Sequence, residues 1–245
     1  MKLLSWNIQA GIATTRFSQY ATRAHRQFLQ TPGKLNTLRG IADVIADYDV
    51  VCLQEVDLGG RRSGFSSQVE FLAAESNHPY FEAQENRVVR KISRHGNAIF
   101  SRYPLRIEDD MKLPGKFVGR GALIARVEHA DSFVVVNTHL SLGAVDRAAQ
   151  LGAIGEALPS SGKWVLCGDL NLRASDPALK VFYAEHEVTQ MSNGPASYPS
   201  WTPKQDLDHI LCGADLLRTD YLALPVLKSD HLPVTATIVA RDHEV

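Results

Sequence analysis

The chain has 245 residues, with 26 Lys and Arg against 27 Asp and Glu, so its formal net charge is −1. A content of 44% hydrophobic and 22% charged residues is normal for a folded protein and excludes a disordered chain. The near-zero charge excludes a protein that attracts nucleic acid or anionic membranes through its bulk charge. No Pro/Gly/Ser-rich linker divides the sequence, so we expect residues 1–245 to form a single domain.

Short apolar runs that end in Gly, Asp, Asn or Pro predict a series of strands. In chain order they are Leu3–Trp6, Val50–Gln54, Ala98–Ser101, Ala122–Val127, Phe133–Thr138, Trp164–Cys167, Ile210–Cys212 and Val234–Val239. Several of these runs are too closely spaced for βαβ crossovers. The pattern therefore predicts an α/β protein with a mixed sheet, or two sheets, and helices on the outside.

Four helices are expected between the strands. Leu35–Asp47 and Val145–Leu158 have apolar residues on one side at helical spacing, and Gln68–Ser76 shows a weaker form of the same pattern. Pro177–His186 begins with Asp176 as a predicted N-cap and a proline at the first helical position.

The three cysteines, Cys52, Cys167 and Cys212, form no CxxC or Cys/His cluster, so neither a zinc site nor a disulfide framework is indicated. Cys52 and Cys167 lie in apolar runs and are expected to be buried. No secretory segment is apparent, and no apolar run approaches the ~20 residues that span a bilayer. We expect a cytoplasmic monomer without a transmembrane segment.

One stretch departs from the even charge balance. Residues 86–107 contain six cations and no acid, namely Arg87, Arg90, Lys91, Arg94, Arg102 and Arg106. A solvated loop face is the simpler interpretation. The alternative is a strip that faces phosphate groups, because Lys and Arg attract them.

The most informative pattern is that apolar runs end in acids, amides or histidines. The motifs are SWNIQ (5–9), LQEVD (53–57), GNAIFSRYPL (96–105), NTHL (137–140), GDLN (168–171), LDHIL (207–211) and SDHLPV (229–234). Polar residues at many strand ends can converge at one edge of a sheet, where α/β active sites form. Oxygen ligands without cysteine suit Mg²⁺ or Mn²⁺ rather than zinc.

This ordered set of motifs resembles the endonuclease/exonuclease/phosphatase superfamily, which includes DNase I-like nucleases, 5-phosphatases and neutral sphingomyelinases. The resemblance extends from residue 5 to residue 234 and thus covers nearly the whole chain. It implies a four-layer α/β sandwich, with two packed mixed β-sheets flanked by helices. It also implies a metal-dependent hydrolase that directs an in-line attack of water on a phosphodiester.

The resemblance assigns metal binding to three residues. Glu55 is similar to the family's metal-binding glutamate, Asp230 to its second metal-associated acid, and Asn7 to the asparagine of the first strand, near the metal. The implied cofactor is Mg²⁺, with Mn²⁺ as a substitute.

The catalytic residues follow from the same resemblance. Asp169 and Asn171 match the pair that orients the attacking water and contacts the phosphate. Asp208 and His231 match an Asp–His dyad, in which the carboxylate supports the charge of the imidazole. His139 matches a histidine that occurs in some branches of the family.

His139 also marks a departure from the family pattern. In DNase I-like nucleases a carboxylate on a neighbouring strand partners this histidine, whereas the comparable stretch here is Arg94-His95-Gly96-Asn97. Either Asn97 partners His139 or the role is redistributed.

Two segments keep more than one interpretation, and one histidine is expected to be structural. The loop 197–203 is either a surface loop or a substrate-side rim in which Trp201 contacts the headgroup. The stretch 14–30 is a surface insertion, or else a lid or an arm that contacts the membrane or the substrate. His209 is expected to face away from Asp208 and to be structural, because strand residues alternate between faces.

Three functions compete at this point. The first is a Mg²⁺-dependent phosphodiesterase that acts on a lipid headgroup or small phosphodiester, which the neutral charge favours slightly. The second is a DNA endonuclease or exonuclease, against which stands the lack of a basic surplus. The third, a non-catalytic binding module, is disfavoured because no catalytic position is substituted.

Overall fold

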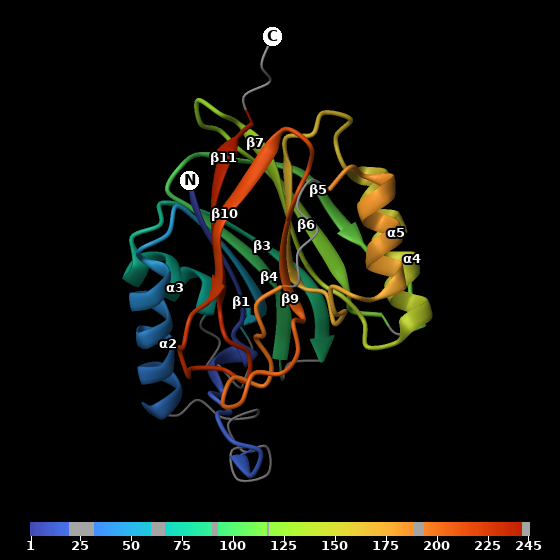
Figure 1. Cartoon of the computed structure of the whole chain (residues 1–245). Coiled ribbons are helices and arrows are strands. Elements are labelled where there is room, and N and C mark those ends of the chain that lie inside the picture. The colour runs from blue at the N-terminus through green and yellow to red at the C-terminus, as the bar shows by residue number, and fades with distance from the viewer. Residues whose placement is uncertain (20–31, 60–66, 90–92, 117, 189–193, 242–245) are drawn as a thin grey trace.

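Two β-sheets pack face to face, with helices on both outer sides (Figure 1). The computed structural model describes residues 1–19, 32–59, 67–89, 93–116, 118–188 and 194–241. The six-stranded sheet has the order β10-β11-β1-β2-β4-β3, and the five-stranded sheet has the order β5-β6-β7-β8-β9. Both sheets contain parallel and antiparallel pairs. The expected four-layer fold is confirmed.

All predicted strands and helices are present in the structure. The strands are β1 Lys2–Asn7, β2 Val50–Asp57, β3 Tyr80–Val89, β4 Ser93–Ser101, β5 Leu105–Lys112, β6 Gly121–Val127, β7 Phe133–His139, β8 Trp164–Asp169, β9 Asp208–Cys212, β10 Leu216–Ala223 and β11 Val234–Ala240. The helices are the short 3₁₀ segment η1 Gln9–Gly11, then α2 Pro32–Ile45, α3 Gln68–Ser76, α4 Ala144–Ala157 and α5 Pro177–Glu185. Asp176 caps α5 as predicted, because its side chain accepts a hydrogen bond from the Ala178 amide. None of the helices in the described part of the chain combines the length and apolar composition that crossing a bilayer requires.

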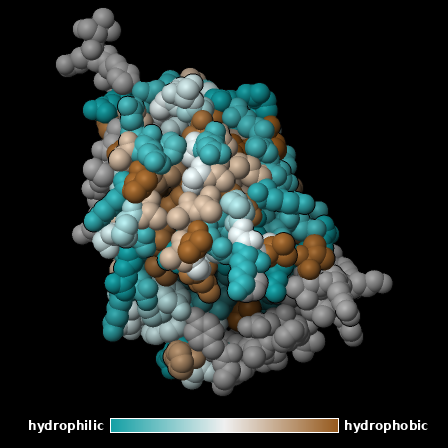
Figure 2. All heavy atoms as spheres, turned by 90° about the vertical axis from the view of Figure 1, so that its right-hand side faces the viewer, coloured by the Kyte–Doolittle hydropathy of each residue, from teal (hydrophilic) through white to brown (hydrophobic). Residues whose placement is uncertain are grey.

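Three apolar layers hold the four structural layers together. Cys52, Val135 and Cys167 belong to the central layer between the two sheets, where the cysteines are free and buried as expected. A second cluster joins the six-stranded sheet to α2 and α3, and a third joins the five-stranded sheet to α4 and α5. The outer face of α4 and α5 carries scattered hydrophobic side chains among hydrophilic ones (Figure 2). The helices thus cover the outer faces of the two sheets rather than the ends of the strands, where a site can form.

Three strands, β3, β5 and β10, escaped the sequence-based prediction. Each of them is an edge strand of its sheet. In β5 most side chains between Leu105 and Lys112 are exposed, so its sequence, LRIEDDMK, lacks an apolar run. Charged residues are typical of edge strands, where they discourage pairing with other chains. Apolar runs therefore reveal the inner strands and miss these edges.

Candidate active site

The strand ends that carry the predicted polar residues meet at one edge of the sandwich. The parallel pairs β1–β2 and β7–β8 place four carboxyl ends on this side. The antiparallel strands β9 and β11 begin there, and Asp208 lies opposite Asp169 in the β8–β9 ladder. Seven of the predicted site residues line a cleft of about 430 Å³, namely Asn7, Glu55, His139, Asp169, Asn171, Asp230 and His231. The eighth, Asp208, is fully buried and contacts His231.

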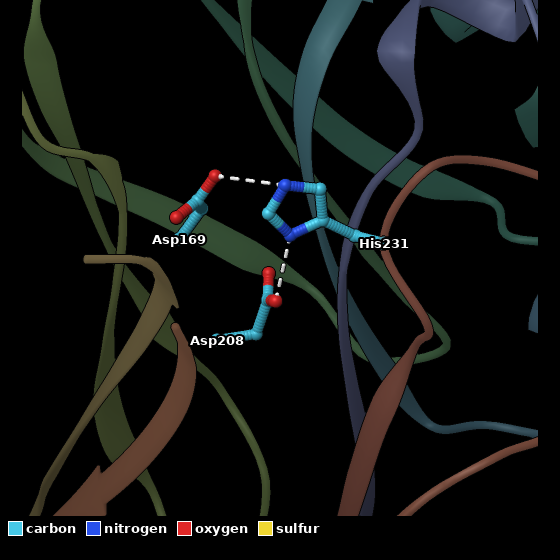
Figure 3. Close-up of side chains that lie close together, drawn as sticks. All are labelled: Asp169, Asp208 and His231. Atoms are coloured by element: carbon cyan, nitrogen blue, oxygen red, sulfur yellow. Dashed lines mark hydrogen bonds and ion pairs between the residues drawn. The ribbon is translucent and has the colours of Figure 1, made fainter. Parts of the chain in front are cut away.

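Asp208 and His231 form the predicted dyad (Figure 3). His231 Nδ1 lies 2.8 Å from Asp208 Oδ2, and the other ring nitrogen, Nε2, points at Asp169 Oδ2 over 3.6 Å. The hydroxyl of Ser197 donates a second hydrogen bond to Asp208 Oδ2. Ser197 therefore helps to fix the carboxylate that orients the imidazole.

The His231 ring is held in its charged form. Burial opposes that charge, but the adjacent carboxylates of Asp208 and Asp169 outweigh it and raise the pKa of His231 well above its usual 6.5. An imidazolium with one N–H directed into the cleft can bind a phosphate oxygen or donate a proton.

Asp169 is the most connected carboxylate in the cleft. Its Oδ2 accepts a hydrogen bond from Asn7 Nδ2 over 3.0 Å and lies 3.4 Å from His139 Nε2. Its Oδ1 accepts from the backbone amide of Asn171 over 3.1 Å. Asn171 is anchored in turn, because its side-chain amide donates to the Leu140 carbonyl. These contacts fix the direction of Asp169, which is 1% exposed.

The glycine of GDLN explains how Asp169 reaches this position. Gly168 has a φ of +149°, and a Cβ added to it would lie 1.9 Å from the Thr138 carbonyl oxygen. Only glycine allows β8 to approach β7 this closely just before Asp169.

Glu55 projects from an irregularity in β2. The register between β2 and β4 shifts between Leu53 and Val56, and Glu55 has a positive φ of 56°. Such bulges redirect a side chain, here toward the cleft. Burial, and then the charges of Asp230 and Asp169, raise the pKa of Glu55 above its usual 4.5. Mutual repulsion of this kind is relieved when a cation binds among the carboxylates.

The donor set of the described residues fits a metal ion. Ligand atoms of Asp169, Asp208 and His231 lie within 4.8 Å of one another, so this buried cluster could hold a metal if His231 gave up its proton. Asp208 Oδ1 is buried and has no hydrogen-bond partner among the described residues. Several carboxylate oxygens in one cleft match the preference of hard divalent cations.

His139 lies between two carboxylates. Its Nδ1 is 3.8 Å from Glu55 Oε1 and its Nε2 faces Asp169. The side chain of Asn97 points elsewhere and donates to Gln84 Oε1 over 3.2 Å, so the partner role is redistributed to the two acids. Burial lowers the pKa of His139 from 6.5 to about 3, in contrast to His231. His139 is thus a neutral imidazole that can donate one hydrogen bond.

The sequence assigns no role to Arg120 or Gln9, and it includes Ser197 and Tyr198 only as members of the loop 197–203. Arg120 lines the cleft, Tyr198 packs its ring 4.8 Å from that of His231, and Ser197 contacts Asp208. Gln9 donates to Asp230 Oδ2 over 3.2 Å. Gln9 sits within the first motif and could have been inferred, whereas a lone arginine before a strand carries no such signal.

The features left open in the sequence have different outcomes. The loop 197–203 belongs to the site, but through Ser197 and Tyr198, while Trp201 is not among the residues that line the cleft. Of the stretch 14–30, residues 20–30 lie outside the described residues.

The cation-rich stretch 86–107 is largely a solvated face. Three of its members form exposed ion pairs, which are Arg94–Glu85, Arg102–Asp49 and Arg106–Glu108. Arg90 and Lys91 lie outside the described residues. Arg87 differs, because it lines a cavity that adjoins the cleft.

His209 is structural, as predicted, and gives the stability a pH dependence. It is 1% exposed, and its Nε2 lies 2.7 Å from the Leu172 carbonyl oxygen. Burial lowers the pKa of His209 below 6.5 in the folded state. The unfolded chain therefore binds more protons below pH 6.5, so this residue costs stability as the pH falls.

We expect His209→Gln to weaken that dependence. Gln can still donate to the Leu172 carbonyl but does not titrate. Urea unfolding at a series of pH values should show a shallower acid-side slope, by up to about 1.4 kcal/mol per pH unit. Parallel slopes for the two proteins would contradict the assignment.

Comparison with known proteins agrees with this geometry. A sequence model described as the endonuclease/exonuclease/phosphatase family matches residues 4–231. The uncharacterized protein YbhP of Escherichia coli K12 is 31% identical over 214 residues, which cover 78% of this chain and 83% of that protein. The structure is similar to an endonuclease/exonuclease/phosphatase from Beutenbergia cavernae, with a TM-score of 0.74, 22% identity, and coverage of 98% of this chain and 71% of that one. It is also similar to the mannosyl-6-phosphatase Bt3783 of Bacteroides thetaiotaomicron, with a TM-score of 0.73, 14% identity, and coverage of 98% and 99%.

Proposed function

Because this chain belongs to the endonuclease/exonuclease/phosphatase family, we propose that it is a Mg²⁺-dependent phosphodiester hydrolase that acts on a phospholipid headgroup or a small phosphodiester. The observation that carries the proposal is the charged His231–Asp208 dyad, which faces the buried Asp169 beside the carboxylates of Glu55 and Asp230. Hydrolysis of a phosphodiester needs a cation that neutralises its charge, a base that positions a water, and a donor that binds or protonates its oxygens. In this proposal the carboxylates hold the cation, Asp169 is the base and His231 is the donor.

Glu55 and Asp230 are the carboxylates that we propose to hold the metal, with Asn7 next to them. The side-chain oxygen of Asn7, Oδ1, accepts a hydrogen bond from the backbone amide of Gln9 over 3.1 Å. It keeps a second lone pair that is free to bind a metal. Bound Mg²⁺ would offset the charge of the phosphate oxygens, and Mn²⁺ would substitute for it.

Asp169 is the proposed general base for the attacking water. Asn7, His139 and the Asn171 amide direct its two oxygens, so it can take a proton from a water bound in line with the leaving oxygen. We propose that Asn171 contacts the phosphate.

The two histidines then serve different roles. His231 remains charged and provides an N–H for a phosphate oxygen or a proton for the leaving group. His139 remains neutral, so it acts as a hydrogen-bond donor rather than an acid.

Arg120 adds a cation that the sequence motifs did not indicate. It precedes β6 and lines the cleft together with Glu55 and Asp169. Burial lowers the pKa of Arg120, and the two carboxylates oppose that shift. A guanidinium retains its charge even so, and its fork of N–H groups suits phosphate oxygens. Arg120 therefore compensates in part for the small number of cations elsewhere.

DNA cleavage is the second candidate function, and the family name itself includes nucleases. Binding to duplex DNA draws on several Lys and Arg contacts to the phosphates. The described cations of the 86–107 stretch are mostly engaged with acids, which favours a small or lipid substrate.

A substrate panel tests the proposal. We expect the protein with Mg²⁺ to hydrolyse bis-p-nitrophenyl phosphate, and to prefer it to p-nitrophenyl phosphate, a monoester. The panel adds phospholipid vesicles, sphingomyelin, inositol phosphates, abasic duplex and supercoiled plasmid. Turnover of monoesters alone would refute a diesterase, and plasmid nicking that persists at moderate salt would reverse the order of the two candidates.

A further inference from the structure

A second cavity of about 600 Å³ adjoins the catalytic cleft. It shares Glu55, Arg120 and His139 with the cleft and extends outward between the ends of β3 and β4, the loop before β6 and the start of α4. One molecule could therefore occupy both the cleft and this cavity. None of the catalytic roles proposed above makes use of this space.

The cavity is lined by cations from separate segments of the chain. Arg87 comes from β3, Lys116 from the loop after β5, and Arg120 from the residue before β6. Arg87 packs against Gly119, since a Cβ added to that glycine would lie 3.1 Å from Arg87 Cβ. Gly119 has a φ of +109°, which side chains rarely adopt, so a glycine here lets Arg87 pack against the residue that precedes Arg120.

Asp146, the acid at the outer wall of the cavity, is hydrogen-bonded to the backbone of the loop after β5. Both oxygens of Asp146 lie 3.2 Å from the backbone amide of Lys116, and Gln150 Nε2 donates to the Pro114 carbonyl over 2.8 Å. Asp146 thus fastens the loop to α4. Three cations, Arg87, Lys116 and Arg120, and two acids, Glu55 and Asp146, line the cavity, so cations outnumber acids there.

The lining is poorly suited to a cationic headgroup. Quaternary ammonium groups bind within aromatic cages. Among the described residues that line the cavity there is no Phe, Tyr or Trp. The apolar members, Val118, Leu142 and Val145, are 95%, 76% and 84% exposed and therefore stand at the rim.

We propose that this cavity is a subsite for a second anionic group, so that the substrate is a phosphodiester with an arm that ends in a phosphate, phosphonate or carboxylate. The inference rests on the proposed function and narrows its substrate class. Arginine pairs with such groups through two parallel hydrogen bonds, and Lys116 adds a point charge.

Three esters with one leaving group test the subsite. They are the p-nitrophenyl phosphodiesters whose second arm is propyl, 3-phosphonopropyl or 3-(trimethylammonio)propyl. We expect kcat/KM for the phosphonate arm to exceed that for the propyl arm by about ten-fold or more, as for one or two charged hydrogen bonds. The trimethylammonio arm should be the poorest of the three.

Substitutions of the cavity residues test which side chains cause the preference for the phosphonate arm. Arg87→Ala should lower the phosphonate-to-propyl ratio by roughly ten-fold, and Lys116→Ala should lower it as well. Arg106→Ala removes the same charge from an exposed ion pair outside the cavity and should leave the ratio as it is. Using the ratio cancels any general loss of activity. Equal kcat/KM for the phosphonate and propyl arms, or a preference that survives in both cavity variants, would overturn the subsite.

Failure of the subsite and failure of the proposed function give different results. Turnover of all three esters at one rate retains the diesterase and removes the subsite. If none is hydrolysed, the diesterase fails, and calorimetric titration of the Asp169→Asn protein with the phosphonate and propyl esters still decides the subsite. Tighter binding of the phosphonate ester, lost with Arg87→Ala, would support it, and equal binding would refute it.

Discussion

Treatment with EDTA is expected to abolish hydrolysis of bis-p-nitrophenyl phosphate, and added Mg²⁺ or Mn²⁺ should restore it. Without a cation, Glu55, Asp169 and Asp230 present a negative surface to a negative substrate. A divalent ion contributes several kcal/mol of charge stabilisation, so we expect a loss of at least about a thousand-fold in kcat/KM. Full activity in metal-free protein would refute this mechanism.

Stability provides a second readout of the same site. A ligand that binds only the folded protein raises its free energy of unfolding, so Mg²⁺ should raise the thermal midpoint. Glu55→Gln should reduce that increase, because it removes one of the charges that attract the ion. Glu156→Gln, the same exchange on the exposed face of α4, serves as the matched control and should respond to Mg²⁺ like the unaltered protein.

Asp169→Asn is expected to lower kcat by about 10²–10⁴-fold while the protein remains folded. The amide keeps the size of the carboxylate but cannot accept the proton of the attacking water. The measurement is steady-state turnover with saturating Mg²⁺, together with a thermal unfolding curve. Retained turnover would show that Asp169 is not the base.

Asp176→Asn is the matched control for this variant. Asp176 caps α5 through a bond from the Ala178 amide, and Asn caps helices equally well. It should therefore leave both kcat and the unfolding curve close to those of the unaltered protein. A comparable loss in both variants would point to a general effect of the substitution rather than to catalysis.

The inner strands and the helices could be read from the sequence because burial demands apolar residues at a regular period. Val50–Gln54 and Phe133–Thr138 each begin with an apolar run of four residues, and both became inner strands. The edge strands β3, β5 and β10 could not be read in this way, whereas β9, the remaining edge strand, has an apolar run. In β5 the exposed acids 108–110 hide the strand, and its existence depends on pairing with β6, a contact between distant residues.

The eight candidate residues followed from motifs, since each acid, amide or histidine lies at the end of a recognisable run. The sequence could not supply their mutual geometry. Parallel pairing of β7 with β8 brings His139 to Asp169 over 30 positions of chain, and the packing of the two sheets brings Asn7 to Asp169 over 162 positions. The opposite charge states of His139 and His231 also arise from tertiary contacts, because only His231 has Asp208 at 2.8 Å.

The sequence by itself determined the family resemblance, the layered fold and the set of chemical groups, because these depend on local residue types and their order. The tertiary structure alone decided which carboxylates face His139, that Ser197 supports the dyad, and that Arg87 and Arg120 line one cavity beside the cleft. The physical reason is that charge and hydrogen bonding act over a few ångströms in space. Residues that are far apart in the chain acquire those neighbours only when the two sheets have packed together.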